Sequence, residues 1–268
     1  MYLDDRGIML LYSMPDKSSI CVVITVYNEG DTIVPCIRNA KKLTDSIVVI
    51  DTGSTDHTVQ QAKKEHVPVY AFPYSQYVEP SRNFALSKAQ AEWVFILDAD
   101  ERFSPKLIKE IQEIIAQTSK THFKVRRNNI FAGKWLLKYG GWRNDSIIRL
   151  IKTDAFVNWP DRIHSTPEIT GDCGVLSKPL EHHFHPNLEN MVSKTVLYEN
   201  IEAELLYRAG RNVHIHTFFR KFLGELYRRL LRGQGFRDGT PGILESIYQA
   251  YSKTITYLFL YEKKSTSL

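Results

Sequence analysis

Strand-like apolar runs and amphipathic helical segments alternate through the first part of the chain. The runs that predict strands are residues 20–26, 47–50, 67–72 and 93–97. The segments that predict helices are residues 31–43, a stretch that ends near residue 64, and residues 80–89. Strands that alternate with helices are typical of a mostly parallel sheet covered by helices. We therefore expect an α/β fold with a Rossmann-like sheet and helices on both of its faces.

The alternation ends after a further predicted helix over 105–117. Ser104 supplies a capping hydroxyl and Pro105 a first-turn proline, and the leucine and isoleucines that follow recur with the period of a helix. Residues 121–186 are rich in Trp, Arg, Asn, Gly and His and contain only short strand-like pieces, at 123–126 and 147–151.

Helical patterns return after residue 187 and cover 188–209, 217–232 and 241–268. We therefore expect two regions, a domain over 1–186 and a helical extension over 187–268. The first region divides into halves at 18–118 and 119–186, because the strand-helix alternation stops between them.

The composition is that of a globular protein. The 268 residues are 43% hydrophobic and 24% charged, and no window approaches 18 uninterrupted apolar residues. The acidic start of the chain is a poor signal peptide, so we expect a cytoplasmic protein. Cys21, Cys36 and Cys173 lack metal-ligand spacing, and we expect them to fill the packed core.

Basic residues crowd around one predicted helix. Six of the chain's 35 Lys and Arg residues lie between 220 and 237, beside aromatic and leucine pairs spaced four apart. A basic amphipathic helix favours an anionic membrane surface, and we assign that contact to residues 217–237. The alternative is a helix that packs on the rest of the protein and solvates its basic face. Nucleic-acid binding is disfavoured, since exposed aromatics do not accompany the arginines.

Two carboxylates follow the apolar strand that ends at Leu97. Asp98 and Asp100 are two residues apart, so both can point from the same face of an extended chain. Carboxylates together with substrate phosphates are the usual ligands of Mg²⁺ or Mn²⁺. The sequence therefore predicts a divalent metal and a phosphate-bearing substrate. The alternative is that these acids merely end a strand and open a helix.

Two other predicted strands also end in polar motifs, Thr25-Val26-Tyr27-Asn28-Glu29 and Asp51-Thr52-Gly53-Ser54. The carboxyl ends of strands in an open α/β sheet line one crevice, where ligands bind. Asp51 can accept a hydrogen bond from a base N–H, Glu29 can bind a ribose, and Gly53 permits close backbone approach. Arg82, at the start of a helix, can bind phosphate or form a surface ion pair. Taken singly, these motifs are also ordinary turn and cap chemistry.

These motifs, with the Leu97-Asp98-Ala99-Asp100-Glu101 segment, resemble the nucleotide-sugar half of inverting family-two glycosyltransferases of GT-A fold. The resemblance continues through Gly141-Trp142, Ile148-Arg149-Leu150 and Gly235-Phe236-Arg237, and is closest to the lipopolysaccharide-core glucosyltransferase branch of WaaE or KdtX type. It implies a donor site and a metal site. The donor residues would be Thr25, Tyr27, Glu29, Asp51, Gly53, Arg82 and Asp98, and the metal ligands Asp98 and Asp100.

The base that deprotonates the acceptor is not assigned by the sequence. In the resembling branch a His-Glu pair follows the apolar strand after the Trp-rich loop, whereas this chain has Ser165 after His164. The candidates are Asp145, His164 and Glu168, with Asp161 behind them. His182, in a histidine cluster at 182–185, can complete the metal shell or make an ordinary polar contact.

Aromatic side chains of the second half, Trp135, Tyr139, Trp142 and Trp159, can form platforms for sugar rings or pack in the core. We therefore expect a metal-dependent inverting transferase that moves a hexose, glucose by resemblance, from a UDP-sugar to a lipopolysaccharide-core or other envelope glycan or glycolipid. A silent glycan- or nucleotide-binding protein on the same fold is the alternative. A Rossmann oxidoreductase is disfavoured because no G-x-G-x-x-G follows the first strand.

Overall fold

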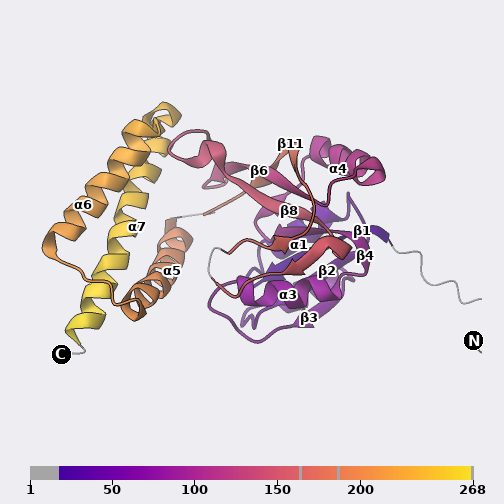
Figure 1. Ribbon diagram of the computed structural model, residues 1–268, viewed down its shortest axis with the longest axis horizontal. Helices are drawn as coiled ribbons and strands as arrows, with labels where there is room; N and C mark the ends of the chain where they lie inside the picture. Colours follow the sequence, from indigo (N-terminus) through magenta and orange to yellow (C-terminus); the bar gives the residue numbers. More distant parts are fainter. Residues whose placement is uncertain (1–17, 163–164, 186–187, 267–268) are drawn as a thin grey trace, which may run out of the picture. The chain divides into compact units, whose positions relative to one another are not determined.

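A computed structural model describes residues 18–162, 165–185 and 188–266 (Figure 1). The chain forms two compact units, each built from three stretches of sequence. Unit 1 comprises residues 1–98, 112–123 and 149–174, and unit 2 comprises residues 99–111, 124–148 and 175–268. Several elements begin in one unit and end in the other, so the two units cannot be separated by a single cut of the chain.

Unit 1 contains the parallel part of the sheet. Its strands lie in the order β3 (Val69–Ala71), β2 (Ile47–Asp51), β1 (Ser18–Val26) and β4 (Ala91–Asp98), all parallel. The antiparallel strand β8 (Ser146–Lys152) pairs with β4. The register sets Thr25 of β1 opposite Asp98 of β4, and Val26 opposite Asp51 of β2. The polar residues that end these strands therefore lie at the same edge of the sheet.

The central strands β1, β2 and β4 are mostly apolar, as expected of strands covered on both faces of the sheet. Every residue of β2 is buried, and Ile24, Phe95 and Leu97 are fully buried. The connecting helices are α1 (Ile33–Ala40), α2 (Thr58–Lys64) and α3 (Glu79–Lys88). A separate two-stranded ladder joins β9 (Phe156–Asn158) and β10 (Glu168–Ile169).

The remaining strands form the β part of unit 2. β5 (Glu101–Arg102) pairs with the end of β11 (Cys173–His182), and β7 (Trp135–Leu137) pairs with the end of β6 (His122–Phe131); both pairs are antiparallel. Helix α4 (Pro105–Gln117) begins in this unit. Its predicted cap is confirmed, since the Leu107 amide donates to the Ser104 hydroxyl at 3.2 Å.

Three helices follow, as the sequence predicts. They are α5 (Leu188–Arg208), α6 (Ile215–Leu226) and α7 (Gly239–Ser265), and a π-helical turn (Tyr227–Arg232) extends α6. Figure 1 shows α6 running beside α7, and the two share a small core with α5 around Ala203, Tyr257 and Leu260. Within the described chain, no helix is both long enough and apolar enough to span a bilayer.

The predicted fold class is confirmed: a mixed α/β protein with a mostly parallel sheet and a C-terminal helical extension. Cys21 and Cys36 are buried, as expected of packing residues, and all three cysteines are free. The expectation was wrong for Cys173, which is exposed because it opens β11 at a turn.

Candidate active site

The first group of polar residues lies in unit 1, at the carboxyl ends of β1 and β2. Both carboxylate oxygens of Asp51 accept hydrogen bonds from the turn that follows, from the amides of Gly53 and Ser54 at 3.2 Å. Gly53 has a φ of +91°, which favours glycine, and a Cβ added there would lie 3.3 Å from that of Tyr74. The turn therefore fixes Asp51 and leaves backbone close to the aromatic side chain beside it.

That aromatic side chain has a partner from the neighbouring loop. The rings of Tyr27 and Tyr74 lie 4.9 Å apart at 45°, and Tyr27 remains 38% exposed. The same loop holds Glu29, whose carboxylate accepts a hydrogen bond from the Thr32 hydroxyl and whose amide donates to Thr58 at 2.8 Å. Exposed ring surface and a carboxylate thus lie on the loop that leaves β1.

Asp98, the last residue of β4, lies between two buried arginines. Arg82 Nη2 donates to Asp98 Oδ1 at 2.9 Å, and Arg149 Nη2 donates to the other carboxylate oxygen. Burial opposes ionisation of this carboxyl, but the guanidinium groups of Arg149 and Arg82 outweigh it and hold the pKa of Asp98 well below its usual range. Asp98 is therefore an anion held between two cations.

Arg82 has donors to spare. Its guanidinium group is buried and lies over the Trp159 ring at 5.5 Å, and its Nε and Nη1 have no hydrogen-bond partner within the described part of the chain. The Thr25 hydroxyl, opposite Asp98 in the sheet, is likewise buried without a partner among those residues. Unsatisfied buried donors are costly and are a common feature of ligand sites.

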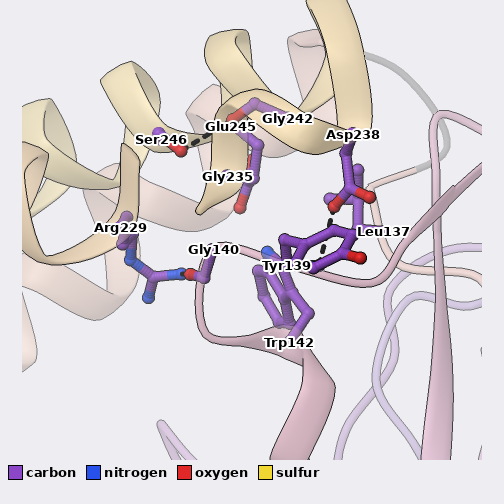
Figure 2. Close-up of a pocket in the computed structure, with 10 residues that line it drawn as sticks. All are labelled: Leu137, Tyr139, Gly140, Trp142, Arg229, Gly235, Asp238, Gly242, Glu245 and Ser246. Carbon is purple, nitrogen blue, oxygen red and sulfur yellow. Dashed lines mark hydrogen bonds between the residues drawn. The ribbon is translucent and has the colours of Figure 1, made fainter. Parts of the chain in front are cut away.

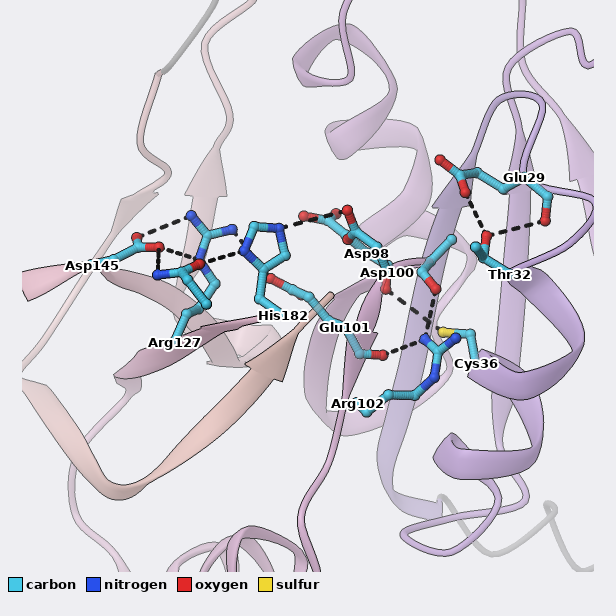
Figure 3. Close-up of polar contacts among 12 residues, drawn as sticks. Glu29, Thr32, Cys36, Asp98, Asp100, Glu101, Arg102, Arg127, Asp145 and His182 are labelled. Atoms are coloured by element: carbon cyan, nitrogen blue, oxygen red, sulfur yellow. Dashed lines mark hydrogen bonds and ion pairs between the residues drawn. The ribbon is translucent and has the colours of Figure 1, made fainter. Parts of the chain in front are cut away.

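A second group of polar residues lies in unit 2 and forms a hydrogen-bonded chain (Figure 3). Arg127 binds Asp145 through Nε at 2.9 Å and Nη2 at 3.0 Å. The buried Asn129 donates to Asp145 at 3.0 Å through its amide nitrogen, and its amide oxygen lies 2.6 Å from Nδ1 of His182. His182 Nε2 in turn lies 3.6 Å from a carboxylate oxygen of Asp100.

This chain of contacts determines where the imidazole proton lies. The carboxylate of Asp145, ion-paired with Arg127, can only accept, so Asn129 must turn its amide NH₂ toward Asp145 and its oxygen toward His182. Because an amide oxygen only accepts, Nδ1 of His182 must donate. Whenever the ring is neutral, its lone pair is then on Nε2, the nitrogen that faces the Asp100 carboxylate. Two electron-rich atoms that face each other are suited to share a proton or a metal ion.

The structure relates the remaining predicted residues as follows. Glu168 lies exposed on β10 in unit 1, and the Asp161 carbonyl accepts a hydrogen bond from the Tyr77 hydroxyl at 3.2 Å. His164 lies outside the described residues. Among the residues that are described, no group of three or more His, Cys, Asp or Glu side chains could by itself hold a metal ion.

The aromatic residues of the second half differ in exposure. Trp159 is 7% exposed beneath Arg82, and Trp142 packs against Phe184 with ring centroids 4.7 Å apart, so both are packing residues. Trp135 is 41% exposed, with Lys134 Nζ over its ring at 4.3 Å and the Phe131 ring stacked 6.1 Å away.

Tyr139 lies in a loop that the helical extension holds in place (Figure 2). Asp238 accepts the amides of Lys138 and Tyr139 at 2.9 and 2.8 Å, and Arg229 donates to the Gly140 carbonyl at 3.1 Å. Arg229 also binds Glu225, so it serves internal packing and not the exposed basic face to which the sequence assigned it.

Three residues of the two polar groups escaped sequence-based prediction of site residues, namely Arg127, Asn129 and Arg149. Arg149 carried a usable signal, because a single arginine interrupts the apolar strand β8 and is only 4% exposed. Arg127 and Asn129 carried none, since alternating polar residues on β6 are what a half-solvated strand also shows.

Several known glycosyltransferases are similar to this chain in sequence. An uncharacterized glycosyltransferase of Rickettsia conorii is 25% identical over 275 residues, which cover 96% of this chain and 93% of that protein. The prophage-derived glycosyltransferase SunS of Bacillus subtilis is 25% identical over 218 residues, 78% of this chain and 50% of SunS.

Among solved structures, glucosyl-3-phosphoglycerate synthase of Mycobacterium tuberculosis, in complex with Mn²⁺ and UDP-glucose, matches 73% of this chain and 80% of its own. The identity is 15% and the TM-score 0.47. Residues 21–180, more than half of the chain, match the family described as glycosyl transferase family 2. The chain therefore belongs to glycosyl transferase family 2, and it is a glycosyltransferase.

Proposed function

We propose that this enzyme is a metal-dependent inverting transferase that moves a hexose from a UDP-sugar to an envelope glycan or glycolipid. Sugar transfer follows from the family; the donor, the metal and the acceptor are the proposal. Glucose as the sugar and the lipopolysaccharide core as the acceptor rest on the resemblance of segments such as Ile148-Arg149-Leu150 to that branch.

The donor would bind at the strand ends of unit 1. The exposed ring of Tyr27 suits a nucleobase, Asp51 keeps acceptor capacity for a base N–H beyond its two turn contacts, and Glu29 suits a ribose hydroxyl. Arg82, with buried donors that no described residue satisfies, suits a diphosphate oxygen. In this proposal Asp98 orients Arg82 and Arg149 for the donor, since both of its oxygens already bind guanidinium groups.

The metal would bind at Asp100 and His182. The observation that carries this proposal is the 3.6 Å approach of His182 Nε2 to Asp100, with the Nε2 lone pair turned toward the carboxylate by Asn129. Mg²⁺ or Mn²⁺ fits an oxygen and an imidazole nitrogen that leave other positions to phosphate oxygens. When bound, such a metal would neutralise the charge that develops on the departing nucleoside diphosphate.

Asp145 is our choice for the base that takes the proton from the acceptor hydroxyl. Arg127 and Asn129 orient its carboxylate, and it belongs to the same hydrogen-bonded chain as His182. A fixed base is what a single displacement with inversion needs, because no covalent intermediate holds the sugar in place. Glu168 is exposed, no described residue orients its carboxylate, and it serves as the comparison.

We further propose that the enzyme works at the inner face of the cytoplasmic membrane, held there through the basic segment 217–237. A glycolipid acceptor presents its sugars at such a surface, and the exposed side of α6 carries both apolar and basic residues.

The decisive experiment measures thermal stabilisation and donor hydrolysis with a panel of nucleotide sugars, each with Mn²⁺, with Mg²⁺ and with a chelator. We expect stabilisation by UDP-sugars that needs a metal, because a ligand bound only to the folded state raises its apparent stability. Asp100→Ala should be inactive, and the metal should no longer increase its stabilisation by UDP-sugars. Full metal-dependent activity in Asp100→Ala would refute the metal site, and stabilisation by another class of nucleotide would refute the donor.

A further inference from the structure

The solvent-exposed face of α6 and its π-helical extension carries two parallel columns of side chains. The first column is apolar and the second is mostly basic, and successive members of each are four residues apart. The apolar column consists of Ile215, Phe219, Leu223, Tyr227 and Leu231, which are 56–73% exposed. The adjacent column consists of His216, Arg220, Gly224, Arg228 and Arg232, all exposed.

An apolar column of this length is unusual on a surface that faces only water. Single exposed apolar residues are common, but a contiguous row marks an interaction site. The opposite side of α6 already packs in the small core with α7, through residues such as Phe218. The exposed column can therefore bind a further partner while the opposite side of α6 stays packed on α7.

A group of cations lies around the N-terminal part of this helix. A cavity of about 370 Å³ lies where α5 turns into α6, and it is lined by Arg211, His214, His216, Thr217, Arg220 and Lys221 together with backbone and Tyr257. None of its lining residues is acidic. The described residues contain no ion pair to Arg211, Arg220 or Lys221; Lys221 lies over the Tyr257 ring at 4.9 Å.

At the other end of the helix, two of the cations are already engaged by one acid. Arg228 and Arg229 both bind Glu225, the latter at 2.6 Å. Arg229 is also only 15% exposed in its side chain. The three cations around the cavity thus lie together without an acidic partner in the described chain, and the exposed Arg232 and Arg237 add charge at the other end.

We propose that this face docks on an anionic phospholipid bilayer. The apolar column enters the boundary between headgroups and acyl chains, and the cationic cavity at the start of α6 binds a lipid phosphate. A bilayer has an anionic headgroup layer next to an apolar acyl layer. The basic column would face the headgroups and the apolar column the acyl chains, so both columns would be matched at once. A second copy of the chain fits less well, because a symmetric contact would bring the same basic columns together.

This inference rests on the proposed membrane location and not on the proposed sugar transfer, so its test uses no sugar. The full chain is sedimented with vesicles of phosphatidylcholine alone or with phosphatidylglycerol added. We expect binding only to the anionic vesicles. Replacing Arg211, Arg220 and Lys221 by Gln should weaken that binding by roughly a hundredfold, because each cation at an anionic surface contributes about a factor of five.

Two matched variants make the comparison specific. Lys42→Gln with Lys63→Gln and Lys64→Gln removes the same charge from exposed positions of unit 1 and should leave vesicle binding nearly unchanged. Phe219→Ser with Leu223→Ser should release the protein from vesicles, whereas Val157→Ser with Val175→Ser, also exposed, should not. Unchanged thermal midpoints show that each variant is folded.

Three results would overturn the proposal. Equal weakening by the cavity variant and its lysine control would mean that only net charge matters. Loss of a dimer in Phe219→Ser with Leu223→Ser, with vesicle binding retained, would assign the face to a second copy. Inorganic phosphate that stabilises the wild type but not the cavity variant, without any vesicle binding, would assign the cavity to a free anion.

Discussion

The amide oxygen of Asn129 lies 2.6 Å from Nδ1 of His182, and this contact decides which imidazole nitrogen faces Asp100. Ligands of a metal are commonly oriented by such outer contacts, whose loss typically weakens metal binding 10- to 100-fold. Asn129→Leu should therefore raise the Mn²⁺ concentration needed for half-maximal activity by about that factor. The measurement is a Mn²⁺ titration of activity and of thermal stabilisation. An unchanged titration would mean that His182 needs no help from Asn129.

The same substitution should lower the free energy of unfolding much more at Asp98 than at Asp100. Asp98→Asn removes the anion between Arg82 and Arg149, whose side chains are 4% and 5% exposed, and should lower the free energy of unfolding by about 3 kcal/mol. Asp100→Asn removes a carboxylate that lies 3.6 Å from His182 Nε2 and should lower it by less, by about 1 kcal/mol. Urea denaturation without metal measures both values.

The activities of the same two variants complete the comparison. Asp100→Asn should be folded and inactive at every Mn²⁺ concentration tested. If Asp98→Asn proves as stable as the wild type, then other groups balance the charge of the two arginines. In that case Asp98 is not the residue that orients them.

Asp145→Asn tests the choice of base. The amide cannot take a proton, so sugar transfer should fall by about 10² to 10⁴, while stabilisation by UDP and Mn²⁺ should persist because no donor or metal contact is assigned to Asp145. Glu168→Gln is the matched control and should keep nearly full activity. A large loss in Glu168→Gln together with a small one in Asp145→Asn would exchange the two roles.

Glu245 should give the enzyme a pH-dependent stability. Burial raises its pKa to about 7, against the lowering effects of a hydrogen bond from Gln249 and of Arg229. A carboxyl whose pKa is higher in the folded state stabilises the fold when protonated. That contribution is complete below the unfolded value of 4.5 and is lost as the pH rises to about 7.

The shift in the pKa of Glu245 corresponds to about 3 kcal/mol between these limits. Glu245→Gln should flatten the dependence by that amount in urea denaturation at pH 5 and pH 8. The exposed Glu189→Gln should leave it unchanged. Equal slopes in wild type and Glu245→Gln would show that Glu245 ionises as easily in the folded protein as in the unfolded one.

The fold was predictable because burial leaves a periodic mark on the sequence. The apolar runs of β1, β2 and β4 and the stripe of α4 were found within a few residues of their observed ends. The strand-end positions of Asp51 and Asp98 followed from the same pattern. The orientation of His182 could not be predicted, because Asn129 and Asp145 lie 53 and 37 positions earlier in the chain and only tertiary packing brings them together.

The contacts between the helical extension and the loop at 137–142 predict the effect of truncating the protein. Asp238 accepts the amides of Lys138 and Tyr139, and Met191 of α5 packs with Phe131 and Leu137. A chain ended at residue 186 would leave those amides without their acceptor and that apolar surface in water. The three helices are therefore not a detachable anchor, because they form one compact unit with the β segments that carry Asp145 and His182.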